Sequence, residues 1–121
     1  MRLRLLSLVV LAGCITPSIP IPPPDPSEMQ FHLTTTGTES SAVFTYPATE
    51  AYKGGTVYLF DRTNGRGVFQ VANADGSLGP TLALPATLGD QVVVSIENVE
   101  QTVSTCVVLQ EGAQNPNQVC Q

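Results

Sequence analysis

Apolar and polar residues alternate with a period of two over much of the chain after residue 30. Val92, Val94 and Ile96 fall on one face of such a segment, and polar residues such as Ser95 fall on the other. This pattern is typical of a half-buried β-strand. No long segment places apolar residues at helical spacing, so the sequence predicts an all-β domain.

Seven short strands are predicted, near residues 31–36, 42–46, 55–63, 67–73, 80–84, 91–97 and 102–110. Asn64-Gly65 and Asp75-Gly76 separate pairs of these strands and suit turns with positive φ. About 90 residues are enough for one β-sandwich with a single core. We expect that core to contain Val57, Leu59, Phe69, Val71, Leu82, Leu84, Val92, Val94, Ile96, Val103, Val107 and Leu109.

The N-terminus has the order of an export signal. Arg2 and Arg4 precede an apolar run from Leu5 to Leu11, and small residues follow. A transmembrane helix would need about 20 apolar residues, and a proline cluster follows too soon to allow one. The sequence therefore predicts a cleaved signal over residues 1–13.

The end of this run, Leu11-Ala12-Gly13-Cys14, resembles the lipobox of bacterial lipoproteins. The resemblance implies that Cys14 receives diacylglycerol and becomes the first residue of the mature chain. An ordinary signal would instead end in an Ala-x-Ala-like site, which is absent. Two or more acyl chains give stable anchoring. Because Ile15 rather than an aspartate follows, similarity to enterobacterial sorting rules implies the outer membrane.

Residues 14–30 are rich in proline, which favours an extended polyproline II conformation. We expect a stiff, solvated spacer that holds the domain up to about 50 Å from the bilayer, at about 3.1 Å per residue. A proline-binding partner is the alternative. The predicted organisation is thus signal (1–13), lipidated cysteine and linker (14–30) and β-sandwich (31–121).

The stretch from Gly55 to Gly112 resembles bacterial immunoglobulin-like and carboxypeptidase-regulatory-like repeats. The resemblance rests on Gly55-Thr56-Val57, Val71-Ala72-Asn73-Ala74-Asp75-Gly76-Ser77, Leu84-Pro85-Ala86 and Gly89-Asp90. Those families use an Ala-Asp-x-Asp-Gly-Ser turn, in which Asn73 here replaces one aspartate. The resemblance implies an immunoglobulin-like sandwich of about seven strands that spaces, binds or assembles rather than catalyses.

Once Cys14 is acylated, Cys106 and Cys120 are the remaining cysteines. A pair of cysteines outside the cytoplasm usually forms a disulfide. If Val107 and Leu109 face the core, Cys106 points away from it and holds the C-terminal tail against the last strand. A metal pair or reactive thiols are the alternatives, although no further histidine or cysteine completes a zinc set.

Catalytic chemistry has little support. His32 is the only histidine, and it lies in the first predicted strand. A Ser-His-Asp set would have to include Ser40 or Ser41, and neither lies in a nucleophile-elbow sequence. We therefore assign no catalytic residue and expect no enzyme activity.

Three carboxylates, those of Asp61, Asp75 and Asp90, lie at predicted strand ends. Some immunoglobulin-like modules gather such groups around calcium, a hard ion that prefers oxygen ligands. We expect Asp75 and Asp90 to cap turns and Asp61 to be solvated at an edge, with calcium as the alternative. No cofactor or metal site is assigned.

The net charge limits the classes of molecule that the chain is expected to bind. Without the signal, the chain has three basic and ten acidic residues, which gives a net charge of −7. Nucleic acid and anionic headgroups both require clustered lysine and arginine, so this charge argues against either as a partner. Anchoring therefore depends on the lipid.

Two functions from different classes fit these predictions. The first is a structural or interaction module that docks another envelope protein through an exposed sheet edge or loops. The second is a small-ligand or glycan module, for which Tyr46, Tyr52, Tyr58 and Phe60 are the candidate aromatic residues. A ligand module predicts a concave site with exposed aromatic rings, whereas a docking module predicts an uncovered, sparsely charged strand edge.

Overall fold

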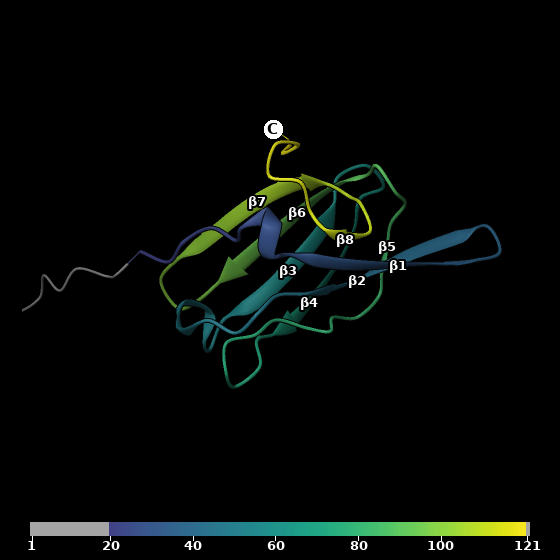
Figure 1. The fold of residues 1–121 in the computed structure, drawn as a ribbon. Coiled ribbons are helices and arrows are strands. Elements are labelled where there is room, and N and C mark those ends of the chain that lie inside the picture. The colour runs from purple at the N-terminus through teal and green to yellow at the C-terminus, as the bar shows by residue number, and fades with distance from the viewer. Residues whose placement is uncertain (1–19, 121) are drawn as a thin grey trace, which may run out of the picture.

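Two antiparallel β-sheets make up the part of the protein that the computed structural model describes, residues 20–120 (Figure 1). One sheet has the strand order β5–β2–β1–β8, and the other has the order β4–β3–β6–β7. The elements are η1 (Pro26–Glu28), β1 (Gln30–Thr36), β2 (Glu39–Thr45), η2 (Glu50–Tyr52), β3 (Thr56–Asp61), β4 (Arg66–Val71), β5 (Leu84–Pro85), β6 (Gln91–Glu97), β7 (Thr102–Val108) and β8 (Gly112–Ala113), where η marks a 3-10 helix. The predicted all-β sandwich is confirmed, with eight strands rather than seven because the sequence does not predict β8.

The facing sides of the two sheets enclose one apolar core. β6 buries Val92, Val94 and Ile96 completely, as their alternation predicts. Eight of the predicted core residues are buried, and Val103 is partly buried. The buried apolar residues are Met29, Phe31, Ala42, Phe44, Tyr52, Val57, Leu59, Leu78, Leu84, Ala86, Val92, Val94, Ile96, Val107 and Leu109.

Three residues predicted to be core are exposed instead. The register of β4 against β3 turns Phe69 and Val71 to the outer face of the sheet, where they expose 65% and 63% of their surface. Leu82 is exposed because its neighbour Thr81 turns inward. The Thr81 hydroxyl there accepts a hydrogen bond from the backbone N–H of Phe44 (3.1 Å). The core prediction is wrong for these three residues.

Residues 20–30, expected to belong to a solvated spacer, lie against the sandwich. The Tyr52 hydroxyl donates a hydrogen bond to the carbonyl oxygen of Pro22 (2.7 Å), and the Thr105 hydroxyl donates one to that of Pro24 (2.8 Å). Pro24 is buried. Proline cannot donate a backbone hydrogen bond, but its carbonyl remains a strong acceptor. The folded unit therefore includes this half of the proline-rich segment.

The export signal and the lipobox cysteine Cys14 lie outside the described residues. Within residues 20–120, no helix is long and apolar enough to cross a membrane. The described chain is fixed near its start, because the backbone N–H of Ile21 donates to the side-chain oxygen of Gln101 (2.9 Å).

Candidate functional site

The hairpin of β1 and β2 projects beyond the rest of its sheet (Figure 1). The two strands pair along their full lengths of seven residues each. β8 pairs only with Gln30 and Phe31 of β1, and β5 pairs only with Ser41 and Ala42 of β2. Among the described residues, no strand covers either edge of the hairpin nearer its tip.

The uncovered edge of β1 begins at Leu33. In an antiparallel sheet, successive residues of a strand direct their backbone N–H and C=O groups to opposite sides. The N–H of Leu33 points away from β2, because it donates to Oε1 of Glu111 (2.9 Å). Thr35 lies two residues further along β1 and has the same orientation. Its N–H and C=O therefore face outward, with no strand of the described chain opposite them.

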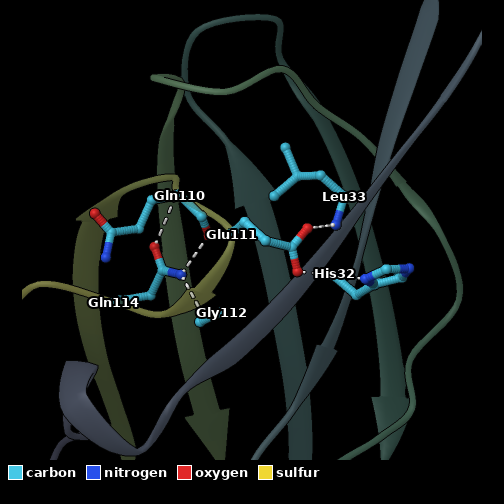
Figure 2. Close-up of polar contacts among 6 residues, drawn as sticks. All are labelled: His32, Leu33, Gln110, Glu111, Gly112 and Gln114. Carbon is cyan, nitrogen blue, oxygen red and sulfur yellow. Dashed lines mark hydrogen bonds and ion pairs between the residues drawn. The ribbon is translucent and has the colours of Figure 1, made fainter.

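Glu111 closes the start of this open edge (Figure 2). Its Oε1 accepts from Leu33, and its Oε2 lies 3.3 Å from Nδ1 of His32. The hydrogen bond from the Leu33 N–H, with a smaller contribution from His32, lowers the pKa of Glu111. An exposed glutamate after a predicted strand has no distinctive sequence pattern, so the sequence analysis does not identify Glu111.

Gln114 holds the turn that positions Glu111 (Figure 2). Its side-chain nitrogen donates to the carbonyl oxygens of Gln110 (2.7 Å) and Gly112 (2.9 Å), and its side-chain oxygen accepts from the N–H of Gln110 (3.1 Å). The residue is only 2% exposed. Its side-chain amide thus provides hydrogen-bond partners for three backbone groups of this turn. These bonds hold the short strand β8 in place next to Glu111.

The open edge lacks the usual protection against pairing with another chain. Residues 33–38 are Leu33, three threonines, Gly37 and Thr38, with no charge and no proline. Natural edge strands are commonly blocked by lysine, proline, a bulge or a covering loop. The nearest ionisable side chains along the hairpin are those of His32 and Glu39, which bound this neutral segment.

The β7 edge of the other sheet is covered by the C-terminal tail, in contrast to the open edge of β1. A disulfide joins Cys106 of β7 to Cys120, whose Cα atoms lie 5.1 Å apart. The backbone N–H of Cys120 donates to the carbonyl oxygen of Cys106 (3.0 Å), and that of Val108 donates to Gln118 (3.3 Å). The predicted disulfide is thus present in the structure, and the C-terminal tail lies along β7.

A hollow of about 500 Å³ lies beside the hairpin on its β2 side. Residues of the hairpin that carry hydroxyl groups, among them Ser40 and Ser41, line it. Asn64 of the β3–β4 turn, Arg66 at the start of β4 and Thr87 also line it. The hollow contains none of the aromatic residues considered for a ligand site.

The candidate aromatic residues divide into two groups. Tyr52 is buried and Tyr46 is half-buried, with their ring centroids 5.6 Å apart at one end of the core. Tyr58 and Phe60 are exposed on the outer face of β3, and Phe69 lies beside Tyr58 at a centroid distance of 5.8 Å. Exposed aromatic rings are therefore present, but they lie on the outer face of a sheet and not in the hollow.

The three candidate carboxylates lie in different environments. Asp75 accepts from both the backbone N–H (2.9 Å) and the hydroxyl (2.6 Å) of Ser77, and Asp90 accepts from the N–H of Thr87 (3.0 Å), so both cap turns as predicted. Asp61 is completely buried, so the prediction that it is solvated is wrong. Within residues 20–120, no group of three histidine, cysteine or acidic side chains is arranged to hold a metal ion.

His32 contacts Glu111 on the exposed side of β1, whereas Ser40 and Ser41 lie on β2. The β1–β2 register places Thr34, not His32, opposite Ser41. The structure thus does not assemble the Ser-His-Asp set that was considered from the sequence.

Comparison of the chain with protein-family models, with curated proteins and with solved structures finds no match. The function proposed below is therefore argued from the residues of this chain alone.

Proposed function

We propose that this chain is a lipid-anchored envelope lipoprotein, and that its sandwich docks another envelope protein by pairing an extended segment of that protein with the open edge of β1. The observation that carries the proposal is the outward orientation of the Thr35 backbone groups on a neutral, projecting hairpin. Strand addition of this kind takes its affinity from backbone hydrogen bonds and its specificity from alternate side chains.

The chemistry of the edge indicates what the partner segment contains. Leu33 is half-buried beside the core, so an apolar side chain of the partner would pack against it. The partner's backbone would bond to Thr35 and to the carbonyl of Leu33. Because residues 33–38 carry no charge, a neutral segment rich in β-branched residues fits best.

The anchor in this proposal is the lipid on Cys14. The export signal, the lipobox and Ile15 support an envelope location, with the outer membrane favoured. The net charge of −7 after removal of the signal gives the domain no attraction for anionic headgroups or nucleic acid. The same acidic surface leaves the neutral edge as the least repulsive place for an acidic envelope protein to approach.

A backbone-specific variant tests this function. In Thr35→Pro, the outward N–H is lost, while the hairpin keeps its own hydrogen bonds because Thr35 does not donate to β2. Thr35→Val is the matched control, since it keeps the N–H and the β-branched shape. Both lipidated proteins would be isolated from detergent-solubilised envelopes, with a photocrosslinking residue at position 34, and the crosslinked partner would be quantified by mass spectrometry.

We expect one stoichiometric partner with the wild type and with Thr35→Val, and at least a tenfold loss with Thr35→Pro. Thr35→Lys, which adds charge without changing the backbone, should also reduce recovery. Equal recovery with all variants would refute docking at this edge, and a crosslink only between two copies of the chain would replace the envelope partner with self-association. Cys14→Ser should abolish lipidation and membrane retention.

A glycan-binding module is the second candidate, favoured by one observation. Tyr58, Phe60 and Phe69 expose their rings on the outer face of β3 and β4, and sugar rings stack on such surfaces through their apolar faces. The Tyr58 hydroxyl also lies 3.2 Å from a carboxylate oxygen of Glu97, which supplies a polar group beside the rings.

Sedimentation with insoluble peptidoglycan separates the two functions. A glycan module predicts binding that is lost in the double variant Tyr58→Ala and Phe69→Ala but retained in Leu82→Ala, an equally exposed apolar control. A docking module predicts that none of these variants alters recovery of the partner crosslinked at position 34.

A further inference from the structure

Asp61 ends β3 with its carboxyl group inside the sandwich, and the residue is 0% exposed. Its Oδ1 accepts hydrogen bonds from the backbone N–H groups of Thr63 (2.8 Å) and Asn64 (3.1 Å). Its Oδ2 is also buried and has no hydrogen-bond partner among the described residues. A buried carboxylate oxygen without a partner is costly, so this position requires a donor or a positive charge.

Two hydrogen bonds hold the segment that carries Asp90 beside the end of β3: the backbone N–H of Arg62 donates to the carbonyl oxygen of Gln91 (2.8 Å), and the N–H of Gln91 donates to the hydroxyl of Thr63 (3.0 Å). The Asp90 carboxyl group contacts that of Asp61 there and raises the pKa of Asp61. Two ionised carboxylates are both acceptors, and neither supplies a hydrogen to the contact. A single proton on either group converts the contact into an O–H to O⁻ hydrogen bond, which is short and strong. Carboxyl groups held this close do not both ionise readily, and they titrate as a pair.

The surrounding groups favour this interpretation. Burial, followed by the contact with Asp90, raises the pKa of Asp61 from its ordinary 3.8 to about 6, while the N–H groups of Asn64 and Thr63 lower it. Asp90 is the charged group whose field acts on Asp61. The neighbouring cations Arg62 and Arg66 are exposed, and Arg62 directs its guanidinium to the sulfur of Cys106 (3.7 Å).

We propose that Asp61 and Asp90 share one proton, which latches the β3–β4 turn to the segment before β6. The β3–β4 turn is also bonded to β5, the strand that leads into this segment, because the side-chain nitrogen of Asn64 donates to the carbonyl oxygen of Pro85 (2.7 Å). Asn64 of the β3–β4 turn and Thr87 of the segment before β6 both line the hollow beside the β1–β2 hairpin. Loss of the proton to solvent leaves two carboxylates in contact, and their repulsion separates these two segments, both of which line the hollow. The device is independent of the docking function proposed above.

The direction of the pH effect follows from the raised pKa. The folded protein retains a proton at pH values where the unfolded chain has released it, so folding is favoured by acid. This contribution is complete below 3.8 and is lost as the pH rises through about 6. Neutral pH therefore opens the latch, and mildly acidic pH closes it.

Thermal unfolding of the full chain at pH 5.0 and pH 7.5 tests the latch. We expect the wild-type Tm to be about 5 °C or more higher at pH 5.0. Asp61→Asn keeps the acceptor for Thr63 and Asn64 and gives Asp90 a permanent N–H donor, so its Tm at pH 7.5 should equal or exceed that of the wild type. Asp75→Asn is the control, because the hydrogen bonds from Ser77 lower the pKa of Asp75 and remove it from this pH window.

Carboxyl-carbon NMR supplies a second measurement that does not depend on unfolding, and the carboxyl carbon of Asp61 should report a titration step near pH 6. A flat wild-type Tm, or a pH dependence that survives in Asp61→Asn, would overturn the proposal. It would also be overturned if calcium at pH 7.5 raised the Tm of the wild type but not of Asp61→Asn, because a metal ion would then be the positive charge between the carboxyl groups.

Discussion

The carboxylate of Glu111 lies 2.9 Å from the backbone nitrogen of Leu33, in the position that the carbonyl of a pairing strand would occupy. A side chain therefore ends the β1–β8 pairing and marks the start of the open edge. Glu111→Ala frees this N–H, and we expect partner recovery in the crosslinking experiment to rise several-fold, with only a small change in Tm because Glu111 is exposed. Glu100→Ala, another exposed glutamate, should leave recovery unchanged. Reduced recovery in Glu111→Ala would mean that Glu111 helps to bind the partner.

The same contact predicts a local pH response. Because the pKa of Glu111 is lowered, the hydrogen bond to Leu33 is complete above the ordinary carboxyl value of 4.5 and is lost as the pH falls through the lower value. The Leu33 amide resonance should therefore titrate with a midpoint below 4.5. His32→Gln should raise this midpoint only slightly, since the N–H of Leu33 is the larger cause. A midpoint at or above 4.5 would contradict the geometry of Figure 2.

Gln114 provides a test of the loop that carries Glu111. Gln114→Leu removes the partners of three backbone groups in Gln110 and Gly112 while keeping the side chain similar in size. Each unsatisfied buried group is costly, so we expect a loss of about 2 kcal/mol or more in the free energy of unfolding, measured with urea. Gln118→Leu, at an exposed position, should change it by less than about 0.5 kcal/mol.

Gly76 tests the second predicted turn. An alanine Cβ there would lie only 1.9 Å from the carbonyl oxygen of Thr49, and the backbone has a φ of +84°. Gly76→Ala should therefore cost about 3 kcal/mol or more, because neither backbone can move freely. Gly37→Ala in the hairpin turn has a similar φ of +64° but open space around it, and we expect a cost of about 1 kcal/mol. Similar losses in the two variants would show that backbone strain alone decides both.

The disulfide tests how the tail protects β7. Replacing Cys106 and Cys120 by alanine opens a loop with a sequence separation of 14 residues, and we expect a loss of about 3 kcal/mol in the free energy of unfolding. Hydrogen exchange of the Val108 amide should become faster because its bond to Gln118 is no longer held in place. Unchanged protection of Val108 would mean that the tail docks without the crosslink.

The sequence predicted the fold class and most strand positions because period-two alternation and the Gly-containing turns are local signals. The core prediction was wrong where the pairing between strands decides which face of the sheet a side chain occupies. Phe69 is as apolar as a core residue, but the register of β4 turns it outward, whereas Phe31 and Phe44 in polar-looking strands form much of the core. Nothing local in the sequence fixes that choice.

The candidate site was less predictable than the fold. The edges of the hairpin are uncovered toward its tip because β5 and β8 pair with only two residues each. No local sequence signal predicts how short those two strands are. Glu111 and Leu33 are separated by 78 positions along the chain. Gln114 and Pro26, which are joined by a backbone hydrogen bond, are separated by 88 positions (114 − 26). Asp61 was expected to be solvated at a sheet edge because it is charged and lies at a strand end, but it occupies the same inward face of β3 as Val57 and Leu59.

The docking of residues 20–30 onto the sandwich shortens the tether. Only seven positions separate Cys14 from Ile21, whose N–H is fixed to Gln101. Even fully extended, that length of chain reaches about 25 Å, roughly half of the span expected from a free proline-rich spacer. With lipid on Cys14 as proposed, the domain can sweep only a shallow zone above the bilayer, and a docking partner must itself come within that zone.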